Sequence, residues 1–166
     1  MKPVSHRRQM FKELISLKEI ERKFLVETAP EGYESYPFHM IEQAYLCTEP
    51  VVRVRREDSK YYLTYKGKGL LSREEANLPL TEASYAHLLA KADGNILTKK
   101  RYLIPVDGRP DLTIEFDVFE GKFAGLLLAE VEFSSEDDAN AFLPPSWFTK
   151  DVTFSGEYQN SRLSKL

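Results

Sequence analysis

Single-signed charged residues alternate with apolar residues along a series of short segments, and this alternation limits the folds that the chain can adopt. Glu115 and Asp117, for example, alternate with Ile114, Phe116 and Val118. Because successive side chains of a strand point to opposite faces, each such segment predicts a strand with one charged face and one apolar face. The segments are 18–27, 38–47, 50–57, 60–68, 72–80, 96–105, 111–119 and 126–134.

Turn residues separate these segments at short and regular intervals, as at Asp107-Gly108 and Glu120-Gly121. Many short strands joined by tight turns are typical of an antiparallel sheet that closes on itself. We therefore expect a mainly antiparallel α+β fold, built as a closed eight-stranded β-barrel with a few helices packed outside.

Two segments have helix signals. In 81–92, Thr81 is a candidate N-cap and Asp93-Gly94 a stop signal, and in 135–143 the run begins after a serine and ends before Pro144-Pro145. A helical turn after residue 156 is also expected. Residues 1–17 form a separate N-terminal extension, either a short amphipathic helix or a segment without fixed structure, whereas 18–166 form one domain.

The charged strand faces have two interpretations. They can be the solvated side of a half-buried sheet, as in a sandwich, or the lining of an enclosed lumen. A surface evolved for solubility intersperses signs, but here whole strand faces carry one sign. We therefore expect the charged faces to look inward and the apolar faces to pack outward against helices and loops. The pairs are Arg53 and Arg55, Lys66 and Lys68, Lys99 and Arg101, Glu115 and Asp117, and Glu130 and Glu132.

Composition excludes several other classes of protein. The formal net charge of −3 over 166 residues argues against a nucleic-acid binder with a broad basic surface. A single cysteine, Cys47, excludes an intrachain disulfide, and no apolar run approaches the ~20 residues of a membrane span. Without a signal-peptide pattern, we expect a cytoplasmic protein, either a monomer or a homodimer, with no nucleic-acid or membrane partner.

A lumen that holds many ionised groups needs water, metal ions and a polyanionic guest, because an unpaired buried charge is costly. The bases can neutralise a chain of phosphates, and the acids offer the hard oxygen ligands that suit Mg²⁺ or Mn²⁺. The candidate phosphate ligands are Arg53, Arg55, Lys66, Lys68, Arg73, Lys99 and Arg101. The candidate metal ligands are Glu19, Glu21, Glu115, Asp117, Glu130 and Glu132.

The run Glu19-Ile-Glu-Arg-Lys23 resembles the ExExK signature of the CYTH superfamily, the triphosphate tunnel metalloenzymes, and specifically its short bacterial single-domain members. Further matching runs follow in the family's order, and the resemblance covers nearly all of 18–163. These runs are Gln43–Leu46, Arg53–Arg55, Lys66–Lys68, Ser72–Glu75, Lys99–Arg101, Glu115–Asp117 and Glu130–Glu132.

The resemblance implies an eight-stranded tunnel that binds a triphosphate and divalent metal ions. It adds Lys23 to the phosphate ligands and Glu75 to the metal ligands. It also implies that Lys99 acts where the bond breaks and that Tyr45 lies near the tunnel interior, so we take both as candidate catalytic residues. The chain departs from the family at Asn77, where a second acid is common, and at Ser155-Gly-Glu-Tyr158.

The leading hypothesis is a metal-dependent triphosphatase, a hydrolase acting on inorganic tripolyphosphate. One alternative is a class IV-type adenylyl cyclase, which uses the same tunnel to convert ATP to cyclic AMP and pyrophosphate; hydrolysis of thiamine triphosphate is a further variant. Another is a non-catalytic module that binds polyphosphate. In each case the partner is a small-molecule polyanion.

Overall fold

The computed structural model describes residues 17–166, which form a β-barrel with short helices. The amphipathic helix considered for residues 1–17 lies outside the described residues, apart from Leu17 at the start of the first strand. The strands are β1 (Leu17–Leu25), β2 (Phe38–Thr48), β3 (Val51–Glu57), β4 (Lys60–Lys66), β5 (Ser72–Pro79), β6 (Asp93–Val106), β7 (Arg109–Phe119), β8 (Leu127–Glu132) and β9 (Lys150–Asp151). The helices are η1 (Tyr33–Ser35), α2 (Glu82–Leu89), η2 (Gly121–Phe123), α3 (Glu136–Ala141) and α4 (Asn160–Leu163).

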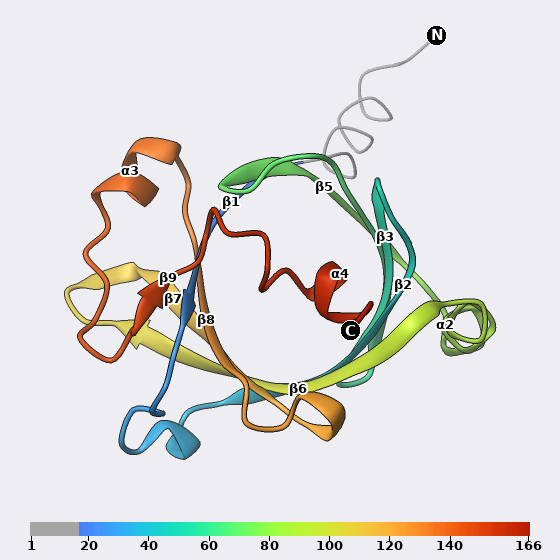
Figure 1. Cartoon of the computed structure of the whole chain (residues 1–166), viewed down its shortest axis with the longest axis horizontal. Helices are drawn as coiled ribbons and strands as arrows, with labels where there is room; N and C mark the ends of the chain where they lie inside the picture. Colours follow the sequence, from blue (N-terminus) through green and yellow to red (C-terminus); the bar gives the residue numbers. More distant parts are fainter. Residues whose placement is uncertain (1–16) are drawn as a thin grey trace, which may run out of the picture.

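The barrel closes through β1, which pairs antiparallel with both β8 and β5. The remaining order, β5-β4-β3-β2-β6-β7-β8, completes a ring of eight strands, and the short β9 pairs with β1. Figure 1 shows this ring with α2 and α3 outside it and α4 near its centre. The predicted closed eight-stranded antiparallel barrel is confirmed, and the sandwich interpretation is wrong.

Local sequence signals explain where the helices begin. The hydroxyl of Thr81 accepts a hydrogen bond from the Ser84 amide at 3.1 Å, which caps α2. Ser135 caps α3 in the same way, through the Asp138 amide at 3.1 Å. The helical turn expected after residue 156 corresponds to α4. No helix within residues 17–166 has both the length and the apolar character that crossing a membrane requires.

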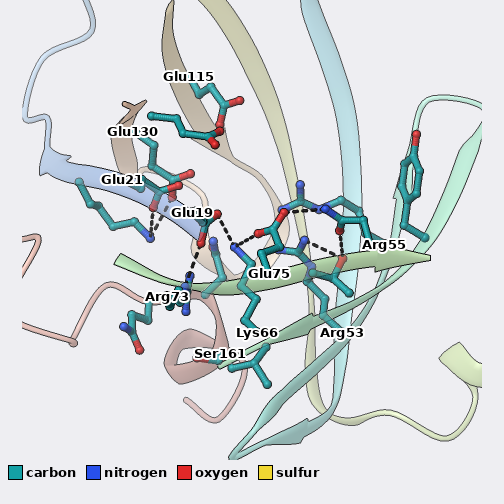
Figure 2. Close-up of a pocket in the computed structure, with 18 of the residues that line it drawn as sticks. Glu19, Glu21, Arg53, Arg55, Lys66, Arg73, Glu75, Glu115, Glu130 and Ser161 are labelled. Atoms are coloured by element: carbon teal, nitrogen blue, oxygen red, sulfur yellow. Dashed lines mark hydrogen bonds and ion pairs between the residues drawn. The ribbon is translucent and has the colours of Figure 1, made fainter. Parts of the chain in front are cut away.

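The charged strand faces point into the barrel, as Figure 2 shows for Glu19, Glu21, Arg53, Arg55 and Lys66. The inward rows change character along their length, from apolar at one end to charged at the other. They read Leu97–Lys99–Arg101 on β6, Phe119–Asp117–Glu115 on β7, Leu128–Glu130–Glu132 on β8, Val51–Arg53–Arg55 on β3 and Leu25–Lys23–Glu21 on β1.

The apolar ends of these rows pack together and close one end of the barrel. Tyr45, Leu97, Phe119 and Leu128 are buried there against Leu163 of α4. The C-terminal helix therefore helps to fill this end of the barrel, and the charged rows surround the space that remains.

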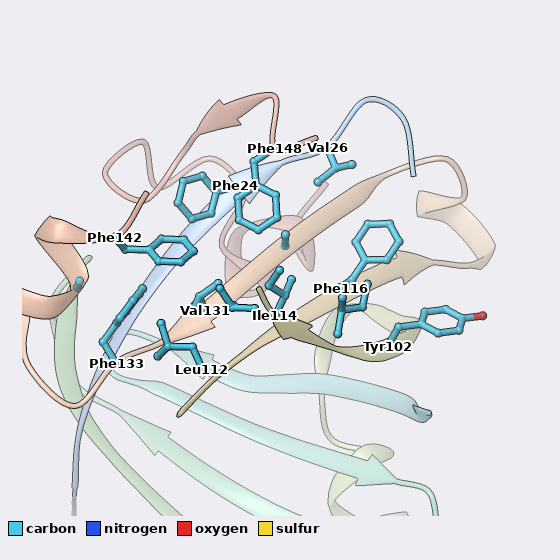
Figure 3. Packing of buried hydrophobic residues seen from close by; sticks show 14 of the residues in the cluster. Phe24, Val26, Tyr102, Leu112, Ile114, Phe116, Val131, Phe133, Phe142 and Phe148 are labelled. Carbon is cyan, nitrogen blue, oxygen red and sulfur yellow. The ribbon is translucent and has the colours of Figure 1, made fainter. Parts of the chain in front are cut away.

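The main hydrophobic core lies outside the barrel. The outward faces of β1, β6, β7 and β8 contribute Phe24, Phe116 and Val131, and the chain from α3 to residue 148 covers them with Phe142 and Phe148 (Figure 3). A smaller cluster joins β2, β3 and β4 to α2 around the buried Tyr85. Burial of this outer apolar surface supplies the main driving force for folding and leaves the interior free for charged side chains.

Arg22 shows how the outer face tolerates a cation. Its guanidinium donates to the carbonyl oxygens of Ala139 and Phe142, both at 2.9 Å, and pairs with Asp151 at 2.7 Å. Donation to the last carbonyl groups of a helix satisfies acceptors that would otherwise have no partner. Arg22, which lies between Ile20 and Phe24 in the outward row of β1, therefore anchors α3 to the barrel.

Candidate active site

A cavity of about 340 Å³ occupies the charged part of the barrel. This volume lies near the lower end of the ~300–1,000 Å³ that is usual for small-molecule sites. Its ionisable lining combines the bases Lys23, Arg53, Arg55, Lys66, Arg73 and Arg101 with the acids Glu19, Glu21, Glu57, Glu75, Glu115, Glu130 and Glu132. Strand alternation thus brings together side chains from β1, β3, β4, β5, β6, β7 and β8.

Three of the predicted site residues do not line this cavity. Lys68 was expected to continue the inward row of β4, but the strand ends at Lys66, and Lys68 lies exposed in the following turn. The alternation of strand faces no longer applies once the chain leaves the strand, so the prediction that Lys68 shares the face of Lys66 is wrong. The other two residues, Lys99 and Asp117, lie below the cavity.

Lys99 and Asp117 are fully buried and form an ion pair of 2.5 Å. Asp117 also accepts two hydrogen bonds from Arg101, each at 2.7 Å, so it links a cavity-lining arginine to the lysine below it. Burial lowers the pKa of Lys99 to about 8, although Asp117 opposes this shift. The sequence predicts Lys99 as a phosphate-contacting catalytic residue and Asp117 as a metal ligand. In the structure neither lines the cavity, and Asp117 connects Lys99 to Arg101.

Tyr45 lies where the sequence predicted, at the inner wall. Its hydroxyl accepts a hydrogen bond from the Gln43 side-chain amide at 2.9 Å. Tyr45 also lines a second hollow of about 380 Å³, bounded by Asp93, Gly94 and Ser164 among others. Its side chain therefore forms part of the wall between the charged cavity and that hollow.

Glu19 is held by two cations. Its carboxylate oxygens accept from Lys66 Nζ at 2.7 Å and from Arg73 Nε at 2.9 Å, and Lys66 also pairs with Glu75 at 2.8 Å. Burial by itself would raise the pKa of Glu19, but the charges of Lys66 and Arg73 hold it well below its usual range. Glu19 is therefore ionised throughout the neutral range.

A second network surrounds Glu130. This buried carboxylate pairs with Lys23 at 2.9 Å and with Arg101 at 2.6 Å, and Arg101 also contacts Glu115. Burial opposes ionisation, but Lys23 and Arg101 keep the pKa of Glu130 well below its usual range. Each of these acids is thus neutralised by bases from neighbouring strands.

Glu21 and Glu132 lack such compensation. They are partners in the register of β1 and β8, and both face the cavity. The nearest cation to Glu21 is Lys23, at 3.8 Å, and Glu132 makes no ion pair within residues 17–166. Burial and the adjacent Glu130 raise the pKa of Glu21 to about 8, and burial and the neighbouring acids raise that of Glu132. This part of the cavity carries excess negative potential.

The donor chemistry at Glu21 and Glu132 fits a hard divalent cation, which binds carboxylate oxygens and would remove the repulsion between them. No three carboxylate, imidazole or thiol groups converge as a ready metal cage among the residues that the structure describes. The ion pairs explain this, because Lys66, Arg73, Lys23 and Arg101 occupy the neighbouring carboxylates.

The opposite wall carries excess positive potential. Arg53 is only 5% exposed and makes no ion pair with any described residue, and its Nε atom is buried without a hydrogen-bond partner. Arg55 donates to the Gln43 amide oxygen at 2.7 and 3.1 Å, and its nearest acid, Glu57, is 3.8 Å away. Burial and the adjacent Arg53 and Arg101 lower the pKa of Arg55 to about 10. One guanidinium group without an acid partner and a second with only a distant one make an anion site.

Sequence reasoning missed several lining residues. Glu57 continues the inward row of Arg53 and Arg55, so alternation could have found it. Asn77 continues the row of Arg73 and Glu75 in the same way. The C-terminal segment enters the barrel after β9, and no strand pattern predicts that placement. The remaining polar lining residues are Tyr62, Thr64, Gln159, Asn160 and Ser161.

The matches to known proteins agree with this geometry. The model of the CYTH domain family matches residues 17–166. An inorganic triphosphatase of Nitrosomonas europaea is 40% identical over 152 residues, which cover 88% of this chain and 96% of that protein. An inorganic triphosphatase of Acetivibrio thermocellus is 34% identical over 89% of this chain and 94% of its own length.

Solved structures give the same result. A crystal structure of an inorganic triphosphatase superposes with a TM-score of 0.64 at 36% identity, covering 88% of this chain and 93% of its own. The match of the family model, together with the closed barrel and its charged interior, shows that this chain belongs to the CYTH family.

Proposed function

We propose that this chain is a metal-dependent inorganic triphosphatase that hydrolyses tripolyphosphate within the charged cavity. The observation that carries the proposal is the separation of charge across the cavity. On one wall Arg53 has no carboxylate partner among residues 17–166, and Arg55 has only Glu57, at 3.8 Å. On the other wall Glu132 has no cationic partner among these residues, and Glu21 has only Lys23, at 3.8 Å. A bound triphosphate and divalent cations would complete both sides.

In this proposal the phosphate oxygens contact the cavity-lining bases. The bases that pair with acids in the empty cavity exchange those acids for phosphate when the ligand enters. Arginine offers forked contacts to phosphate, and lysine offers a point charge. The proposed phosphate ligands are Lys23, Arg53, Arg55, Lys66, Arg73 and Arg101. Asp117 accepts from Arg101 and pairs with Lys99, so it would position Arg101, and Lys99 would add positive potential beneath the scissile region.

The proposed metal ligands are Glu19, Glu21, Glu75, Glu115, Glu130 and Glu132. Mg²⁺ or Mn²⁺ bound there would neutralise phosphate charge and orient the attacking water. Catalysis of phosphoryl transfer depends mainly on positioning and charge stabilisation, and little on covalent chemistry by the protein. A cavity lined by acids and bases can provide both. The names of the relatives support inorganic tripolyphosphate as substrate, and the small cavity agrees with a ligand that has no nucleoside.

A phosphate-release panel tests the proposal. Purified protein is assayed with tripolyphosphate, pyrophosphate, ATP and thiamine triphosphate, each with Mg²⁺, Mn²⁺ or chelator, and ATP products are separated by chromatography. We expect metal-dependent phosphate release that is fastest with tripolyphosphate. Formation of cyclic AMP and pyrophosphate from ATP would support a cyclase instead, and binding without turnover would support a non-catalytic polyphosphate module.

A further inference from the structure

A chain of hydrogen bonds crosses the cavity wall from Arg53 to Glu75. Arg53 Nη2 donates to Thr64 Oγ1 at 3.1 Å, and the Thr64 hydroxyl donates to Asn77 Oδ1 at 2.6 Å. Asn77 Nδ2 then donates to Glu75 Oε1 at 2.6 Å. Glu75 pairs with Lys66, so the chain connects the positive wall of the cavity with the acidic wall.

Thr64 lies at the centre of this chain and is fully buried. A hydroxyl group has one proton to donate, and here Asn77 receives it. The lone pairs of the oxygen therefore remain to accept from Arg53. Because Thr64 is the one side chain among residues 17–166 that accepts a hydrogen bond from Arg53, it is also what orients this guanidinium group.

Asn77 has the one type of side chain that can hold both neighbours. Its amide oxygen accepts from Thr64, and its amide nitrogen donates to the carboxylate of Glu75. An aspartate at this position would face Glu75 with a second negative charge and could not donate. The departure from the family pattern at Asn77 therefore has a structural consequence, since the amide keeps Glu75 and Thr64 linked.

We infer that Thr64 and Asn77 are positioning residues that fix the Arg53 guanidinium for phosphate binding and couple it to Glu75. This inference rests on the proposed function, because it assigns Arg53 to the substrate. Arg53 is preorganised by the relay, so ligand binding does not have to order a long flexible side chain. Loss of the relay should therefore weaken triphosphate binding more than it slows the chemical step.

Two pairs of variants test the relay. Thr64→Val removes the hydroxyl at nearly constant shape, and Thr64→Ser retains it. Asn77→Leu removes both amide contacts at an exposed position where folding is not at risk. Asn77→Asp keeps an acceptor for Thr64 but replaces the donor to Glu75 with a second negative charge. Binding of tripolyphosphate is measured by titration calorimetry without metal, and kcat and KM are measured with Mg²⁺.

We expect Thr64→Val and Asn77→Leu to weaken tripolyphosphate binding and raise KM by about tenfold, the size of one hydrogen bond to a charged group, with kcat within about twofold of wild type. Thr64→Ser should restore wild-type affinity, and Asn77→Asp should resemble Asn77→Leu. Wild-type affinity in Thr64→Val or Asn77→Leu would overturn the inference, as would an equal loss in Thr64→Ser and Thr64→Val.

The two proposals fail in different ways. Tight tripolyphosphate binding without phosphate release by the wild-type protein would refute the proposed function, and the relay would still be judged from the binding of the variants. Normal turnover together with unchanged binding in all four variants would refute the relay alone. Melting temperatures of the variants confirm that each comparison is made on folded protein.

Discussion

Glu21 is an acid whose ionisation destabilises the empty barrel, and its replacement by glutamine should stabilise the protein while impairing its function. The pKa of Glu21 rises from an ordinary value of 4.5 to about 8 in the folded chain, because of burial first and the adjacent Glu130 second. An acid with a raised folded pKa contributes stability below its unfolded pKa and loses that contribution as pH rises through its folded pKa. The window is therefore pH 4.5 to 8.

The size of the effect follows from the shift. Each unit of pKa difference corresponds to about 1.4 kcal/mol, so the free energy of unfolding of the metal-free protein should lose up to about 4 kcal/mol through Glu21 between pH 4.5 and pH 8. Glutamine does not ionise, so the free energy of unfolding of Glu21→Gln does not fall with pH through this position. The variant should match wild type near pH 4.5 and be more stable by a few kcal/mol near pH 8, about 10 °C in Tm for a domain of this size.

The assay is urea unfolding and thermal melting in chelator from pH 5 to pH 8. The matched control is Glu27→Gln, because Glu27 is exposed just beyond the end of the same strand. The control should stay within about 0.5 kcal/mol of wild type at every pH. Added Mg²⁺ or Mn²⁺ should stabilise wild type and have a smaller effect on Glu21→Gln, since binding to the folded state alone raises Tm. Identical pH profiles of wild type and Glu21→Gln would refute the reasoning.

Three further predictions concern other parts of the barrel. Arg53→Ala should raise KM for tripolyphosphate by about 10- to 100-fold, whereas Lys68→Ala should leave KM within about twofold. Of these two residues, Arg53 lines the cavity and Lys68 does not, and steady-state phosphate release measures both variants. Lys99→Met should lower stability by about 3 kcal/mol in urea unfolding, because it breaks a fully buried ion pair, and a change below about 1 kcal/mol would contradict the support role of Lys99. Phe116→Ala should cost about 3–5 kcal/mol in the same assay, with KM unchanged where the protein is folded, since Phe116 packs outside the barrel.

Alternation along the strands was enough to predict most of the site. The period of two in Glu19–Lys23, Arg53–Arg55 and Glu130–Glu132 assigned each side chain to a face, and the single sign of faces such as the last two indicated an enclosed lumen. The same rule wrongly placed Lys68 in the site, because the strand ends at Lys66 and alternation stops there. Applied one step further along β3 and β5, the rule would have added Glu57 and Asn77.

The sequence by itself determined which residues share a face, which segments are strands and helices, and which chemistry the charged set can perform. Only the tertiary structure decided how deep each inward side chain lies, because depth depends on the register between strands that are distant in the sequence. Register places Lys99 and Asp117 below the cavity and leaves Glu21 beside Glu132, and barrel closure brings the C-terminal Ser161 inside. Whether a charged side chain is compensated depends on which residues of other strands lie beside it, so the pattern within one strand cannot reveal it.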